Sequence, residues 1–136
     1  MNLTFHLAIA GLLQLGLAVS HLWLPRRFGW KEDLAKLSPL NRQIFIVHCL
    51  FIVLVLLLFG GLSLFFGKVL LQPVLMNRLV LGGLTFFWVL RLYAQWFIYD
   101  EALWRGRRFE TAVHLAATML WSYLIVVYSL TLVRQF

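Results

Sequence analysis

The segment Gln43–Phe66, QIFIVHCLFIVLVLLLFGGLSLFF, contains no aspartate, glutamate, lysine or arginine. A helix needs about 20 consecutive apolar residues to cross a hydrocarbon core of about 30 Å. This segment is long enough to do so, and three further apolar segments accompany it, at about 3–24, 78–99 and 111–133. The sequence therefore predicts an all-α integral membrane protein with four transmembrane helices.

The composition of the chain supports this prediction. Of the 136 residues, 62% are hydrophobic and 12% are charged, whereas soluble domains have about 45–50% apolar and about 25% charged residues. All five acidic residues lie outside the four segments, as the high cost of a charge in lipid predicts; they are Glu32, Asp33, Asp100, Glu101 and Glu110. We expect residues 1–136 to form a single membrane domain.

The connection at residues 25–42 separates the first two spans. Ser38 can cap a helix N-terminus, and Pro39 suits the first helical position. Trp30, Leu34 and Leu37 recur at helical spacing, which predicts a short amphipathic helix on the cytoplasmic surface. Because the other connections are short as well, an up-down bundle is the simplest topology.

Basic residues predict the orientation of the bundle. Eight lie in the first and third connections, namely Arg26, Arg27, Lys31, Lys36, Arg42, Arg105, Arg107 and Arg108; the opposite side has Lys68, Arg78 and Arg134. Cytoplasmic loops carry such an excess, so both termini are predicted on the non-cytoplasmic side. Cations beside apolar spans indicate contact with the lipid bilayer rather than nucleic acid. We expect a multi-pass protein of the bacterial inner membrane.

Five polar residues lie in the cytoplasmic half of the predicted spans: His21, His48, Arg91, Gln95 and His114. Arg91 is the strongest signal, because an arginine inside a span costs about 2.5–3.5 kcal/mol on insertion scales unless it finds a partner. No span contains a carboxylate. The partner would be an acidic residue at the helix end, a backbone carbonyl, water or an anionic ligand, or the side chain would reach the interface.

Helical spacing gives these residues a predicted direction. His114, Thr118, Ser122 and Ser129 form a polar stripe on the fourth span, which we expect to face the bundle interior because lipid offers no partners. Asp100 and Glu101, at the end of the third span, are the candidate acidic partners of Arg91. Each histidine has a simpler interpretation too, as an interfacial residue bonded to a carbonyl or a headgroup.

Three functional hypotheses follow. The first is an accessory or structural subunit of a larger membrane complex, with membrane-protein partners and a link to redox chemistry as one version. The second is a haem b protein in which His48 and His114 are the metal ligands of the haem iron and Arg91 faces a propionate. The third is a site for a quinone, a lipid or another amphipathic anion, formed by Arg91, His21 and Gln95. The sequence does not decide whether the chain is an enzyme.

Overall fold

The computed structural model describes residues 2–136 and is helical throughout, with no strand in that part of the chain. Its elements are α1 (Leu3–Ser20), α2 (Leu24–Arg27), α3 (Trp30–Ala35), α4 (Pro39–Phe65), α5 (Gly67–Leu70), α6 (Leu75–Phe97), the 3-10 helix η1 (Glu101–Leu103) and α7 (Arg108–Val133). Four of them, α1, α4, α6 and α7, are long and apolar enough to cross a membrane. The prediction of an all-helical chain with four membrane-length helices is therefore confirmed.

Two predicted boundaries moved for identifiable reasons. The first helix ends at Ser20 rather than Leu24, because Pro25 has no N–H to donate to the carbonyl of His21 one turn earlier. The second begins at Pro39 rather than Gln43, and the Ser38 hydroxyl accepts a hydrogen bond from the Asn41 amide at 3.3 Å. This helix thus starts directly after its capping residue, four residues before the apolar run.

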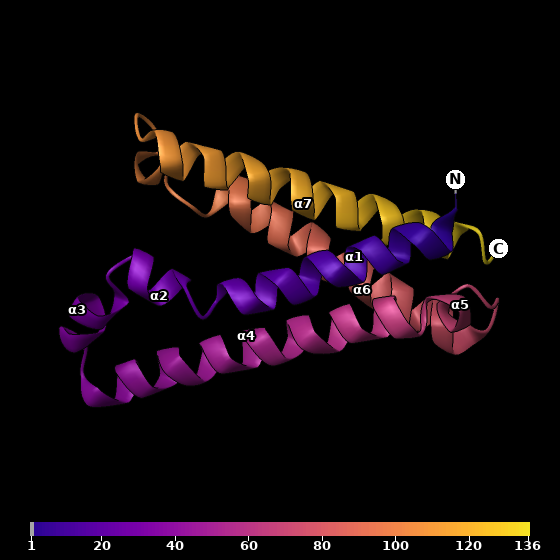
Figure 1. Cartoon of the computed structure of the whole chain (residues 1–136), viewed down its shortest axis with the longest axis horizontal. Helices are drawn as coiled ribbons and strands as arrows, with labels where there is room; N and C mark the ends of the chain where they lie inside the picture. The colour runs from indigo at the N-terminus through magenta and orange to yellow at the C-terminus, as the bar shows by residue number, and fades with distance from the viewer. Residues whose placement is uncertain (1) are drawn as a thin grey trace.

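The four long helices form two pairs. α1 packs along α4, α6 packs along α7, and α1 also contacts α7. Figure 1 shows both chain termini and α5 at one end of the molecule, which we call the terminal end. The other end holds α2, α3 and the α6–α7 connection, and we call it the basic end. The pairs approach each other at the terminal end and diverge toward the basic end (Figure 1). The up-down order and the membrane side of each end stay predictions.

The first contact that joins the helices is between backbones. A Cβ atom on Gly11 of α1 would lie 2.7 Å from the Gly60 carbonyl oxygen and 2.7 Å from the Leu64 amide nitrogen of α4. Small residues allow this approach, which is how membrane helices gain van der Waals contact without a hydrophobic driving force. Gly11 therefore fixes the distance between α1 and α4.

The second contact is a buried hydroxyl. Tyr128 of α7 is fully buried; its oxygen accepts a hydrogen bond from Gln14 Nε2 of α1 at 2.6 Å and bonds Ser63 Oγ of α4 at 2.6 Å. A polar group in an apolar interior is costly unless it is hydrogen-bonded. One hydroxyl thus holds three of the four long helices together in the terminal half.

Aromatic rings continue the core toward the basic end. Trp88 of α6 stacks on Trp121 of α7 with ring centroids 4.9 Å apart. Phe87 of α6 meets Phe59 of α4 edge-on at 5.3 Å. Such pairs stabilise packing beyond their area, by about 0.5–1.5 kcal/mol each.

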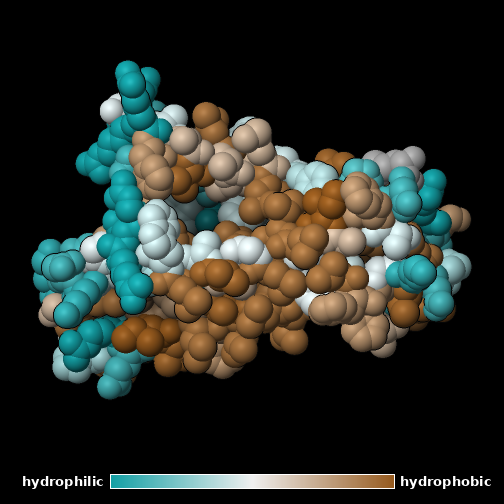
Figure 2. Space-filling view, in the orientation of Figure 1, coloured by the Kyte–Doolittle hydropathy of each residue, from teal (hydrophilic) through white to brown (hydrophobic). Residues whose placement is uncertain are grey.

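The basic half of α4 has almost no cover. Its buried residues are Leu56, Gly60 and Ser63, all in the terminal half, and from Pro39 to Ile52 every residue except Cys49 is exposed. Figure 2 shows hydrophobic side chains over the middle of the molecule and hydrophilic ones gathered at its ends. That distribution suits a bilayer around the middle of the molecule.

We predict that Gly11→Ala lowers the free energy of unfolding by about 1–3 kcal/mol, the usual cost of overpacking, because the new methyl group meets the α4 backbone. Gly16→Ala on the same helix is the matched control, since nothing lies within 4 Å of its Cβ position. The control should be neutral or gain up to about 1 kcal/mol in helix propensity. Unfolding by SDS in dodecyl maltoside measures both variants, and equal effects would contradict the close α1–α4 contact.

Candidate functional site

Three of the five predicted site residues form a hydrogen-bonded chain between α6 and α7. Arg91 NH1 donates to Gln95 Oε1 at 3.2 Å, one turn further along α6. Gln95 Nε2 lies 2.7 Å from His114 Nδ1 of α7. Gln95 is buried, so the chain is anchored inside the α6–α7 pair.

Donor and acceptor chemistry gives this chain a direction. A guanidinium group only donates, so the Gln95 oxygen must accept from Arg91 and the Gln95 nitrogen must donate to His114. His114 Nδ1 is then the acceptor, and neutral His114 carries its proton on Nε2. The hydrogen-bonded series from Arg91 through Gln95 therefore ends at His114, whose Nε2–H is a donor.

Arg91 has neutral partners only. Its Cζ atom lies 5.0 Å from the ring centroid of Trp121 and 5.5 Å from that of Tyr99. The ion pairs within residues 2–136 are Arg27–Glu110, Lys36–Asp33 and Arg105–Glu101. No carboxylate in that range lies within ion-pair distance of Arg91, so its charge has no counter-ion there and is met by an amide oxygen and two ring faces.

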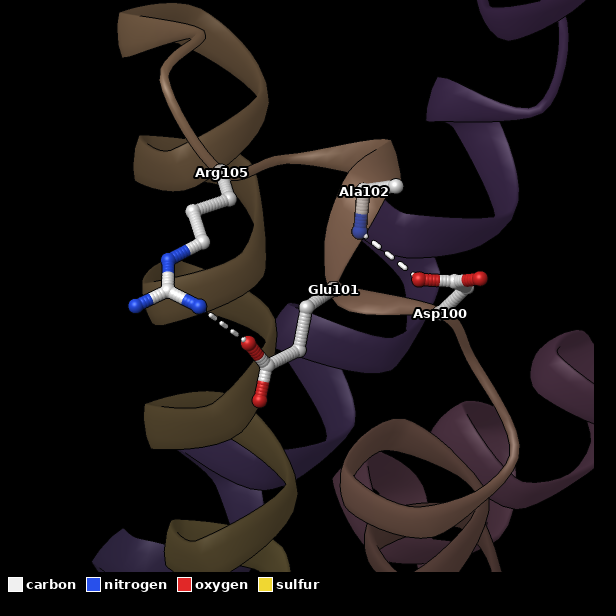
Figure 3. A network of polar contacts seen from close by, with 4 residues as sticks. All are labelled: Asp100, Glu101, Ala102 and Arg105. Carbon is white, nitrogen blue, oxygen red and sulfur yellow. Dashed lines mark hydrogen bonds and ion pairs between the residues drawn. The ribbon is translucent and has the colours of Figure 1, made fainter.

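The predicted acidic partners of Arg91 serve the α6–α7 connection instead. Glu101 Oε2 accepts from Arg105 NH1 at 2.9 Å, and Asp100 Oδ1 accepts from the backbone amide of Ala102 at 2.9 Å (Figure 3). Asp100 thereby caps η1. Neither carboxylate forms an ion pair with Arg91, which was one of the alternatives considered for its partner, because local turn geometry engages both side chains.

His114 lies against an aromatic wall. Its ring stacks on Trp104 with centroids 4.0 Å apart and planes 12° apart. A hollow of about 280 Å³ opens beside it, lined by Trp96, Phe97, Glu101, Trp104 and His114. His114, the last member of the hydrogen-bonded chain, thus borders a hollow.

His21 and His48 do not join this chain. Each side chain instead donates a hydrogen bond to the backbone carbonyl four residues earlier. His21 Nδ1 lies 2.8 Å from the Leu17 oxygen, and His48 Nδ1 lies 2.8 Å from the Ile44 oxygen. A carbonyl only accepts, so both rings carry a proton on Nδ1, and in the neutral tautomer Nε2 is the unprotonated nitrogen. The interfacial interpretation therefore describes His21 and His48 better than His114.

The helical face of His48 is still informative. It precedes Phe59 by eleven residues, about three turns, and so shares a face of α4 with the ring that meets Phe87. Arg91 follows Phe87 by one turn on α6. His48 and Arg91 thus lie on facing sides of the two pairs, where the pairs diverge. Figure 2 shows the surface hollowed between the α6–α7 pair and α1, with hydrophilic atoms at its floor.

The polar stripe of α7 is only partly interior. His114, Thr118, Ser122 and Ser129 are all half-buried, and Thr118 accepts a hydrogen bond from Trp96 Nε1 at 3.4 Å. The buried face of the helix lies beside this stripe and consists of Trp121, Leu124, Val127, Tyr128 and Thr131. The packed face is mainly aromatic and aliphatic, and the polar stripe marks its edge.

Sequence reasoning missed the rings around the site. Trp121 follows His114 by two turns, so helical spacing could have found it. Trp104 and Tyr99 lie in the α6–α7 connection, where no periodicity predicts direction. Within residues 2–136, no group of three His, Cys, Asp or Glu side chains is placed to hold a metal ion.

Compared with known protein families, with curated proteins and with solved structures, the chain matches none.

The hydrogen-bonded chain predicts two classes of histidine tautomer. In ¹⁵N spectra of the histidine-labelled protein at a pH where the rings are neutral, His114 should be protonated on Nε2, whereas His21 and His48 should be protonated on Nδ1. Gln95→Leu should change the His114 signals alone and cost about 1–3 kcal/mol of stability, since it leaves buried groups unpaired.

The matched control is Gln72→Leu, an exposed glutamine outside the long helices. It should leave all histidine signals unchanged. A His114 ring protonated on Nδ1 in the unmodified protein would contradict the assigned direction of the chain.

Proposed function

We propose that this chain is a small membrane protein that binds an amphipathic anion at Arg91, Gln95 and His114, in the basic half of the bundle. One observation carries the proposal: the charge of Arg91 has neutral partners only. A cation inside a span that lacks a counter-ion is costly. An anionic group bound from the membrane would lower that cost.

The donors of the site match the head of such a ligand. A guanidinium group has five N–H donors in a planar fork that fits carboxylate or phosphate oxygens, and the bond to Gln95 uses one of them. His114 adds an N–H donor beside the hollow. Charge-assisted hydrogen bonds of this kind are about twice as strong as neutral ones.

The surroundings match the tail of an amphipathic ligand. Tyr99, Trp104 and Trp121 place aromatic surface around the polar chain, and the exposed apolar face of α4 lies across the diverging pairs. A ligand could enter this space from the bilayer with its tail in lipid. A quinone carbonyl would accept from the same donors, but it is neutral and leaves the charge of Arg91 unbalanced.

Haem ligation by His48 and His114 stays a prediction, and the hydrogen-bonded chain favours the anion instead. Haem iron binds an unprotonated imidazole nitrogen. His48 Nε2 meets that requirement, whereas His114 Nε2 carries a proton as long as Gln95 donates to Nδ1. Iron binding would therefore require the hydrogen bond between Gln95 and His114 to break. An anion can bind while this hydrogen bond stays in place.

Binding of dodecyl phosphate to the purified protein in dodecyl maltoside tests the proposal, with dodecanol as the neutral probe. We expect saturable binding of dodecyl phosphate by calorimetry and a 10- to 100-fold weaker affinity in Arg91→Gln, because a hydrogen bond to a charged group contributes about 1.5–3 kcal/mol. Arg134→Gln, an exposed arginine at the terminal end, is the matched control and should bind normally.

Equal binding of dodecyl phosphate and dodecanol would overturn the proposal. So would an equal loss of affinity in Arg91→Gln and Arg134→Gln, because general charge would then explain the binding. Retained folding of both variants is checked by their SDS unfolding transitions.

A second candidate function is that of a subunit in a larger membrane complex. The supporting observation is α4, whose residues 39–52 are exposed around nearly the whole helix. His48 lies in this stretch, and its Nε2 can accept a hydrogen bond from a partner helix as well as from a headgroup. A partner helix would supply both cover and a donor. The redox link and the bacterial inner membrane stay predictions.

Site-specific photo-crosslinking in the native membrane tests this candidate. A photoreactive residue at Leu50 of α4 should give one discrete protein adduct in near-stoichiometric yield. The same residue at Met119 of α7, of similar exposure, should give lipid adducts alone. Identical patterns at the two positions would argue against a partner on α4.

A further inference from the structure

A groove lies between α3 and the basic half of α4, away from the Arg91 site. Its volume is about 510 Å³, within the range of about 300–1,000 Å³ typical of small-molecule sites. Leu34 of α3 faces Phe45, Ile46 and Cys49 of α4 across it, and its lining is mainly apolar.

The local chain direction explains how the groove forms. Gly29 has a φ of 64°, in the left-handed region that glycine adopts at no steric cost. The chain reverses there, and α3 folds back toward α4. Trp30 and Leu34, four residues apart on one helical face, are half-buried, and the Trp30 ring meets Phe45 edge-on at 5.1 Å.

The rim of the groove carries cations without counter-ions. Arg26 and Lys31 border it, and neither forms an ion pair within residues 2–136. Arg27 and Lys36, their neighbours, do pair, with Glu110 at 3.8 Å and with Asp33 at 3.0 Å. Glu32 also borders the groove, which leaves a net positive rim of two cations against one carboxylate.

We propose that this groove binds one anionic phospholipid from the leaflet at the basic end. An acyl chain lies against Phe45, Ile46 and Cys49, and the phosphate lies at Arg26 and Lys31. Two features support this occupant. The α4 wall belongs to a membrane-length helix, so the groove opens where acyl chains are present, and basic residues beside a span attract anionic headgroups.

Cys49 gives a direct readout, because it lines the groove and is the single cysteine of the chain. The full-length protein in dodecyl maltoside is titrated with dioleoyl phosphatidylglycerol, and the rate of alkylation of Cys49 by N-ethylmaleimide is measured by mass spectrometry. We expect saturable protection of Cys49 by phosphatidylglycerol and none by phosphatidylcholine or inorganic phosphate.

The double variant Arg26→Gln/Lys31→Gln should weaken this protection about tenfold or more, since two cations near an anionic headgroup are lost. The matched control Arg107→Gln/Arg108→Gln removes the same charge from the start of α7 and should protect normally. Folding is checked by SDS unfolding of each variant.

Equal protection by phosphatidylcholine, no protection by either lipid, or an equal loss in the two double variants would each overturn the proposal. Complete protection in protein stripped of copurified lipid, unchanged by added lipid, would also overturn it, because something other than a phospholipid would then cover the groove. The Arg91→Gln variant should protect normally, which separates this groove from the site between α6 and α7.

Discussion

The hydroxyl of Tyr128 is the contact on which the rest of the structure depends. It is fully buried, and it binds Gln14 of α1 and Ser63 of α4 from α7. In a bilayer these three polar groups have no water to return to, so they stabilise the helices that bring them together. Close approach of α1 and α4 at Gly11 and Gly60 tightens the same half of the molecule. The two helix pairs are therefore joined at the terminal end.

The hydrogen bonds of Tyr128 hold the helices together in the terminal half and do not extend into the basic half. α1 ends at Ser20, ahead of Pro25, and α2, which follows it, contacts α7 through the partly exposed ion pair of Arg27 with Glu110 at 3.8 Å. The pairs diverge, α4 loses its cover, and the interior polar groups of α6 and α7 satisfy one another. Arg91 then has Gln95 and ring faces for partners, with no carboxylate. The terminal half, where the helix pairs are joined, thus stabilises the fold. The basic half, where the pairs diverge, holds the polar residues of the candidate site.

The sequence predicted the helical class and, among the five candidate site residues, it included the three that hydrogen bonds join in the structure. Four spans followed from apolar length, and the Ser38 cap followed from residue type. The shared face of Arg91 and Gln95 was readable from their spacing, because both lie on one regular helix. The contact of Gln95 with His114 depends on how α6 and α7 rotate, which no single-helix pattern contains. Trp104 was unpredictable for a different reason, since it lies in a connection without periodicity.

The helix pairs are joined at the terminal end and diverge at the basic end. Distances between paired spin labels in lipid nanodiscs, in a Cys49→Ala background, test this arrangement most directly. One pair, at Phe65 of α4 and Val133 of α7, reports the terminal end, and the other, at Leu40 and Val113, reports the basic end; all four side chains are exposed. We predict a distinctly longer distance for the pair at the basic end. Equal distances, or a shorter one at the basic end, would contradict it, because the helix pairs would then run side by side along their whole length.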